Sequence, residues 1–197
     1  MNKSAVGGLR SLVLLASLTA AFTAAAVDVR PLVKAGFDVG GDTMVRVTFT
    51  NGDTASIKGN EGFYVGGGLA FISAAKDMEF HLSLAYKFAV ITASNGDVDW
   101  TRWPLEALAF YRFPRARVGG GLTYHLSPRL EGSGVVGGLD VSFKNALGAV
   151  LQADWLITPR IAVGARYTHL KYDPKGVFAG AESTKANGVG VAFSMNF

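Results

Sequence analysis

The sequence predicts an all-β protein, a single eight-stranded antiparallel up-and-down transmembrane β-barrel. Three observations support this fold. The last eleven residues, 187–197 (NGVGVAFSMNF), alternate bulky apolar side chains with glycine and small or polar ones. Seven earlier segments show related alternation. The connections between the segments alternate between short turns and mostly longer polar stretches, as they do in membrane-spanning barrels.

The terminal segment carries its apolar residues on one parity, ending at Phe197, and its small or polar residues on the other. Successive side chains of a strand point to opposite faces, so one face is apolar. Apolar groups outside and small or polar groups inside suit a barrel in lipid. The chain resembles the small outer-membrane β-barrels of Gram-negative bacteria, the OmpA/OmpX/OmpW-like group, whose last strand characteristically ends in Phe. The resemblance implies an outer-membrane location and an insertion machinery that recognises the last strand, with Phe197 as the assembly signal.

The first 26 residues have the pattern of a cleavable signal peptide. Lys3 and Arg10 give a basic start, an uncharged apolar run follows, and alanines at 24–26 provide small residues for cleavage after Ala26. The apolar run is shorter than the ~20 residues that a spanning helix needs. Residues 27–197 are therefore predicted to form one barrel domain.

Charge and cysteine content limit the possible partners. Removing residues 1–26 from 197 leaves 171, and loss of Lys3 and Arg10 lowers the formal charge from +4 to +2. No basic run is present that could follow a phosphate backbone, so nucleic-acid binding is not expected. The chain has no cysteine, so stability must come without disulfides, which a closed hydrogen-bonded barrel can achieve.

The strands and turns follow in order along the chain. Strands are expected at about 32–50 (interrupted near 40–41), 54–72, 79–93, 104–113, 117–126, 139–157, 161–172 and 187–197. Short turns are expected at 74–77, 114–116 and 158–160, and the other connections at 51–53, 94–103, 127–134 and 173–186. Outer-membrane barrels have short periplasmic turns and longer extracellular loops, so this phase places both chain ends in the periplasm. A soluble β-sandwich, whose strands also alternate, is the alternative fold.

Parity through the strands assigns an interior and an exterior. The exterior set is apolar: Val33, Phe37, Phe63, Phe80, Leu82, Leu84, Tyr111, Leu122, Leu151, Trp155, Val163 and Phe193. The interior set, also with Tyr64 and Thr123, forms a predicted lumen network of Lys34, Asp38, Arg46, His81, Lys87, Glu106, Arg112, His125, Gln152, Asp154 and Arg166. Eight strands enclose only enough room for their own side chains, and buried charges must pair. The lumen is therefore expected to be plugged by salt bridges, with a narrow pore or a small-ligand pocket as the alternative.

A tryptophan pair marks the predicted loop 94–103. Trp100 and Trp103 flank Arg102 in this polar stretch, which reads as exposed. Such a loop could contact lipopolysaccharide or a partner, or it could pack on the barrel rim. We therefore take these three residues as a candidate surface-interaction site.

Enzymatic chemistry finds little support in the residues. Lipid A deacylases resemble this chain in being eight-stranded barrels, and their seventh strand carries a His-x-Ser pair. Here His169 stands in a fitting place, but Lys171 occupies the position that needs the nucleophilic hydroxyl. The spacing recurs at His125 and Ser127, on the fifth strand with His125 inward. Three scattered histidines and no cysteine give no metal-site pattern, so no enzyme activity, metal or cofactor is expected.

These observations predict a function class rather than a reaction. The barrel is expected to be a structural or surface-interaction protein, in contact with outer-membrane lipid and lipopolysaccharide and monomeric. A narrow channel or binder for small apolar solutes, as OmpW-like barrels are thought to be, is the alternative. A lipid A-modifying acyl hydrolase is a weaker alternative.

Overall fold

The computed structural model describes residues 27–48, 52–93, 95–176 and 179–197. The expected signal peptide, residues 1–26, lies outside the described residues. The elements are β1 (Val27–Gly40), β2 (Thr43–Thr48), β3 (Thr54–Lys58), β4 (Gly62–Ser73), β5 (Met78–Ala93), β6 (Gly96–Arg112), β7 (Ala116–Gly132), the 3-10 helix η1 (Gly134–Val136), β8 (Asp140–Ser142), β9 (Ala146–Thr158), β10 (Ile161–His169), β11 (Lys171–Tyr172), β12 (Thr184–Lys185) and β13 (Gly188–Asn196).

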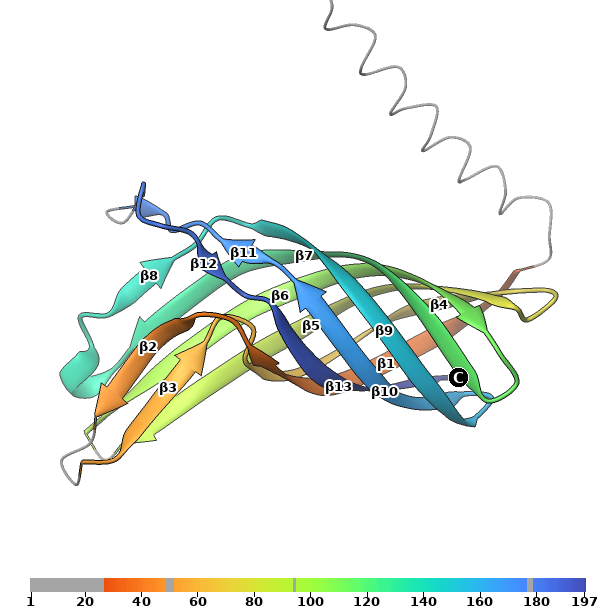
Figure 1. Ribbon diagram of the computed structural model, residues 1–197, viewed down its shortest axis with the longest axis horizontal. Helices are drawn as coiled ribbons and strands as arrows, with labels where there is room; N and C mark the ends of the chain where they lie inside the picture. The colour runs from red at the N-terminus through yellow and green to blue at the C-terminus, as the bar shows by residue number, and fades with distance from the viewer. Residues whose placement is uncertain (1–26, 49–51, 94, 177–178) are drawn as a thin grey trace, which may run out of the picture.

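The main sheet closes on itself as a barrel (Figure 1). Its nine strands run in the order β6-β5-β4-β1-β13-β10-β9-β7-β8, and β6 also pairs with β7. The three-residue β8 is an appendage on β7, so eight strands form the ring. Every pairing is antiparallel, including the closing pair of the first and last strands, in which Phe37 lies opposite Val191. The predicted fold class is confirmed.

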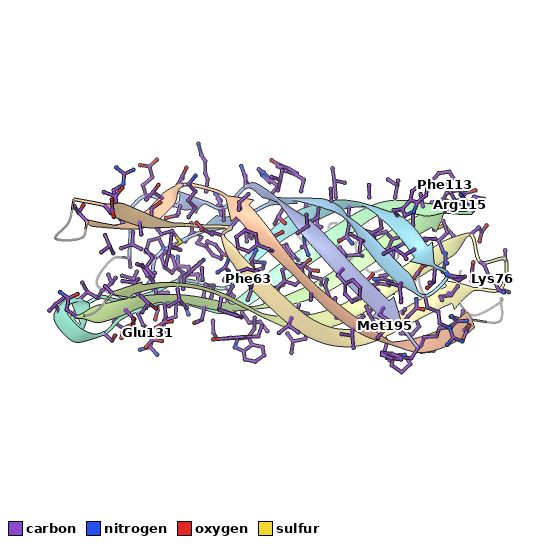
Figure 2. All side chains as sticks on the ribbon, turned by 90° about the horizontal axis from the view of Figure 1, so that it is seen from below. Phe63, Lys76, Phe113, Arg115, Glu131 and Met195 are labelled. Carbon is purple, nitrogen blue, oxygen red and sulfur yellow. The ribbon has the colours of Figure 1, made fainter. Side chains whose placement is uncertain are left out.

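The exterior of the barrel is apolar because one parity of each strand faces outward. Phe63, Leu122, Leu151 and Trp155 are among the outward side chains, each more than half exposed to the surroundings. Phe37 and Phe63 pack across β1 and β4 with ring centroids 4.5 Å apart. A continuous apolar exterior is what a barrel in hydrocarbon requires, and Figure 2 shows its side chains standing off the ribbon. Within the described residues, no helix is long and apolar enough to cross a membrane.

Inward-facing glycines make room inside the barrel. A Cβ on Gly68 of β4 would lie 2.0 Å from the Leu82 carbonyl oxygen of β5, and one on Gly36 of β1 would lie 2.4 Å from the Tyr64 hydroxyl. The glycine runs at 66–68 and 119–121 lie inside β4 and β7 and lead into no helix. This placement fits a packing role and not phosphate binding, because a phosphate-cradling glycine loop precedes a helix.

A second region, the distal lobe, extends the barrel at the end opposite the chain termini (Figure 1). It consists of β2, β3, η1, β8, β11, β12 and the outer ends of β5, β6 and β7. Its interior is apolar and contains a buried cluster of Ile57, Ile91, Val98, Trp100, Leu130, Phe143, Ala146, Leu170, Tyr172 and Ala186. Three segments of this lobe, 94–103, 127–134 and 173–186, were expected to be connections, whereas the segments of β2, β3, β8 and β11 were expected to be strand. The alternation of buried and exposed residues that defines the barrel strands continues through β6 to its distal end, and through β7 with one change of parity at Ser127.

Candidate functional site

The barrel interior near the chain termini is organised around Glu79 of β5. Glu79 Oε1 accepts a hydrogen bond from Arg117 Nη1 at 2.8 Å, and its Oε2 accepts one from Arg112 Nη1 at 3.0 Å. Arg117 Nε also donates to Asp154 Oδ2 at 2.7 Å. Charge-assisted hydrogen bonds thus link β5, β6, β7 and β9, and such bonds are stronger than those between neutral groups.

Neighbouring polar groups complete this Glu79 cluster. His81 Nε2 lies 2.8 Å from Glu79 Oε1. Arg117 Nη2 donates to Ser194 Oγ at 2.6 Å, and Asn196 Nδ2 donates to Glu79 Oε1 at 3.2 Å. The Arg117 guanidinium also stacks over the Phe110 ring at 4.7 Å. The cluster therefore ties β13, the last strand, into the same network.

A second cluster occupies the middle of the lumen. Glu106 of β6 pairs with Lys34 of β1, and Arg166 Nη2 of β10 donates to Glu106 Oε1 at 2.5 Å. Lys87 Nζ donates to Asp38 Oδ2 at 2.5 Å, and Arg166 Nε lies 3.7 Å from Asp38 Oδ1. We call this group the Glu106 cluster.

Tyr64 and Asn60 fill the remaining space around the Glu106 cluster. The Tyr64 ring lies under two cations, with its centroid 5.7 Å from Lys34 Nζ and 5.1 Å from Arg166 Cζ. Lys87 Nζ donates to Asn60 Oδ1 at 3.0 Å. The cavity that these side chains leave is large enough for about one water molecule. The lumen is therefore closed at its middle by side chains.

An aromatic group closes the distal end. Trp100 meets Phe143 edge to face at 5.4 Å and Tyr172 at 5.2 Å, and its Nε1 donates to the Gly59 carbonyl at 3.1 Å. A hydrogen bond of 2.5 Å joins the Tyr172 hydroxyl and His125 Nδ1. Burial raises the pKa of the Tyr172 hydroxyl to about 12, so it stays protonated at neutral pH. This cap separates the lumen clusters from the outside on the lobe side.

The predicted lumen residues fall mostly where parity put them. Lys34, Asp38, His81, Lys87, Glu106, His125, Gln152, Asp154 and Arg166 are buried in the interior, and Arg112 is partly buried at the end near the termini. Arg46 is the exception, because it lies exposed on β2 of the distal lobe. Gly40 and Gly41 have φ of 116° and 90°, which breaks the strand between β1 and β2 and ends the parity count. The prediction that Arg46 points into the lumen is wrong.

The predicted exposed loop at 94–103 is also wrong. β6 begins at Gly96, so Trp100 and Arg102 are fully buried, and Arg102 Nη2 donates to the Glu61 carbonyl at 2.5 Å. Trp103 points outward and packs against Tyr86 at 4.8 Å. The sequence signal was available, because Val98, Trp100 and Arg102 share the parity of Glu106. The polar residues on the alternate positions suggested a loop, whereas they form the solvent-facing side of a strand.

Residues outside the predicted set supply several of the strongest contacts. Glu79 and Arg117 form an ion pair in the Glu79 cluster. Tyr172 is hydrogen-bonded to His125, and Asn60 to Lys87. Parity would have found Glu79, because it shares a face with His81, and Arg117, because it shares a face with Thr123. Asn60 carries no such signal, since it sits in the turn between β3 and β4.

Phe197 ends the chain beside the start of β1. Its backbone N–H donates to the Pro31 carbonyl at 3.1 Å, and its side chain is half exposed on the exterior. The ring is therefore available to other molecules at the end of the barrel that holds the termini.

Comparisons with known proteins agree with this architecture. No protein-family model and no curated protein matches the sequence. Among solved structures, the chain is similar to Ail, the attachment invasion locus protein of Yersinia pestis, with TM-score 0.53 and 15% identity over 85% of this chain and 96% of that one. Neisserial surface protein A aligns with TM-score 0.47 and 14% identity, covering 87% and 99%. OprG of Pseudomonas aeruginosa aligns with TM-score 0.39 and 13% identity, covering 88% and 96%.

The similarity to Ail is one of fold, since the identity is low. It agrees with the closed ring of strands described above. The chain therefore has the fold of the small eight-stranded outer-membrane β-barrels.

Proposed function

We propose that this chain is a monomeric outer-membrane protein of a Gram-negative bacterium that serves as a structural anchor for an extracellular interaction surface. The barrel anchors the chain in the membrane, and the distal lobe lies outside the cell. The observation that carries this proposal is the filled middle of the interior, where the cavity at the Glu106 cluster has room for about one water. Ail, an attachment invasion protein, has the same fold, which is compatible with a surface role.

The filled interior argues against a conduit for small apolar solutes. The middle of the lumen presents the charged groups of Lys34, Glu106 and Arg166, and an apolar solute passing there would have to break their ion pairs. Breaking a buried pair costs several kcal/mol, about 3–5 when one partner is lost. The lumen is better suited to holding the strands together than to transport.

The hydrolase alternative also lacks a nucleophile in position. His169 and Lys171 are both exposed on the exterior, where a lipid A-modifying site would lie, but Lys171 has no hydroxyl. His125 is buried and bonded to Tyr172, whereas Ser127 is exposed, with a φ of 46° that breaks the parity of β7. The two side chains of this His-x-Ser therefore lie in different environments.

Planar-bilayer recording tests the anchor proposal. Purified wild-type barrel is expected to give no discrete openings, because the Glu106 cluster blocks the lumen. A triple variant with Lys34→Ser, Glu106→Ser and Arg166→Ser removes the charge and the bulk of these three side chains. Its openings serve as the positive control for insertion of the barrel into the bilayer. Discrete openings of the wild-type protein would contradict the proposal.

Assembly is proposed to depend on the last strand. Deleting Phe197 is expected to lower the amount of heat-modifiable barrel in the outer membrane several-fold, measured by gel shift of membrane fractions. Phe113→Ala is the matched control, because Phe113 is another half-exposed aromatic at the same end. Normal barrel levels without Phe197 would contradict its role as the assembly signal.

A further inference from the structure

A pair of exposed lysines lies where the barrel exterior passes into the distal lobe. The short strands β11 and β12 continue the pairing of β10 with β13 in the same register. Tyr167 lies opposite Val189 in the barrel, and Lys171 lies opposite Lys185 four residues farther on. Because side chains alternate along a strand, both lysines are on the outward face that carries Tyr167 and Val189.

The two ammonium groups lack acidic partners among the described residues. Lys171 and Lys185 are exposed, and neither forms an ion pair there. The Asp42 carboxylate accepts the Lys185 backbone N–H at 2.8 Å, and Asp173 accepts the Ser183 hydroxyl at 2.5 Å. Like charges directly opposite one another destabilise a strand pair. An anion held between the two side chains would remove this repulsion.

The depth of the pair favours an anion in the membrane interface. Tyr167 is an exposed aromatic residue of the barrel exterior, and because tyrosine is enriched at membrane interfaces we take its level as the edge of the hydrocarbon. Four residues along a strand tilted by about 40° raise the lysines about 10 Å above it, and their flexible side chains can reach back toward the headgroups. Leu147, 64% exposed on the adjacent β9, shows that the apolar exterior extends close to this level.

Two further lysines lie beyond the pair on the same edge. The Lys144 backbone N–H donates to the Asp173 carbonyl at 2.8 Å, and the Lys175 N–H donates to the Ser142 carbonyl at 2.8 Å. Both residues are exposed, and Glu182 and Asp173 are the acidic residues of the same β11–β12 connection. The edge therefore carries four lysines against three carboxylates, counting Asp42, which is a surplus of one positive charge.

We propose that Lys171 and Lys185 bind the phosphate groups of lipopolysaccharide in the outer leaflet. The proposal rests on the extracellular placement of the distal lobe and names the lipid chemistry recognised there. The two ammonium groups would bracket one phosphate, while the apolar exterior around Leu147 and Tyr167 contacts the acyl chains. Each lysine near an anionic surface strengthens binding by about fivefold, so the pair contributes about tenfold or more.

Binding of bisphosphorylated lipid A to the full-length folded protein in detergent, followed by native mass spectrometry, tests the site. The wild type is expected to prefer this lipid about tenfold over dephosphorylated lipid A. The double variant Lys171→Gln, Lys185→Gln is expected to lose that preference. Lys76→Gln with Arg115→Gln removes the same charge at the opposite end (Figure 2) and is expected to keep it.

The other outcomes overturn the assignment. If the wild type binds both lipids equally, or the Lys171, Lys185 variant keeps the preference, the pair is not a phosphate site. If inorganic pyrophosphate displaces lipid A at equal concentration, the lysines bind soluble anions and the lipid assignment fails. Heat-modifiability of each variant confirms that its barrel is folded. Binding is measured in detergent, so the result does not depend on where the protein lies in the cell. Membrane fractionation and surface labelling of the lobe test that location separately.

Discussion

The barrel and the distal lobe bury opposite kinds of side chain on the same strand faces. Along β6, the inward residues are Glu106 within the barrel and then Trp100 and Val98 within the lobe. Outside the barrel the surroundings are hydrocarbon, so apolar groups face outward and the charged ones are enclosed. In the proposed placement the lobe is surrounded by water, so the apolar groups are enclosed. One strand thus changes its interior chemistry at the depth where its solvent changes.

The largest expected effect comes from breaking the Glu79 cluster. Glu79→Ala leaves the guanidinium groups of Arg112 and Arg117 without their shared carboxylate. We expect the free energy of barrel unfolding to fall by about 3–5 kcal/mol, because Arg112 loses its carboxylate partner and Arg117 keeps only Asp154 in a buried site. Urea unfolding in detergent measures it. Asp140→Ala, in an exposed ion pair with Arg129, is the control and is expected to leave the midpoint unchanged; equal shifts in both would show that burial does not matter here.

A smaller, local effect is expected in the lobe. Trp100→Ala removes the ring that contacts Phe143 and Tyr172, at a cost of about 3 kcal/mol. Limited proteolysis should cut the lobe faster, while the barrel keeps its heat-modifiable band. Val135→Ala, at a position 73% exposed on η1, should behave like the wild type. Simultaneous loss of the barrel band would show that the two regions unfold as one.

The smallest effect concerns pH. The pKa of Tyr172 in the folded lobe is about 12, against an ordinary value of 10.0, because burial disfavours the phenolate. The folded state keeps this proton to a higher pH than the unfolded state does. The contribution of Tyr172 to the stability of the lobe is therefore full below pH 10 and falls as the pH rises toward 12. Tyr172→Phe should flatten that part of the pH profile of lobe proteolysis. An unchanged profile in the variant would contradict burial of an ionisable hydroxyl.

Alternation made the barrel predictable from sequence. Period-two patterns identified the eight strands, the outward Phe63 and Trp155, and most of the lumen charges, because a lipid exterior and a crowded interior impose opposite residue types on neighbouring positions. The pairing partners of the lumen side chains were harder to predict. Glu106 binds Lys34 and Arg166 across the barrel, and such pairs depend on strand tilt and stagger, which the pattern of a single strand does not contain.

The lobe was harder to predict because its solvent is that of an ordinary protein. In the segment 97–103, Asp97, Asp99 and Thr101 alternate with Val98, Trp100 and Arg102, and the acidic residues suggested a loop rather than a water-facing strand surface. Arg46 was misplaced because two glycines with positive φ interrupt the strand before it. Parity can be carried only through unbroken strands.

The unbroken β6–β7 hairpin has a mechanical consequence. Its backbone ladder runs from Val98 opposite Gly132 in the lobe to Arg112 opposite Arg117 near the chain termini, with one irregularity near Trp103. Tension applied to the lobe by an attached molecule therefore enters the wall of the barrel directly, without a flexible linker to absorb it. The load is shared among many hydrogen bonds pulled along the strands, which makes the hairpin a stiff connection between the lobe and the barrel wall.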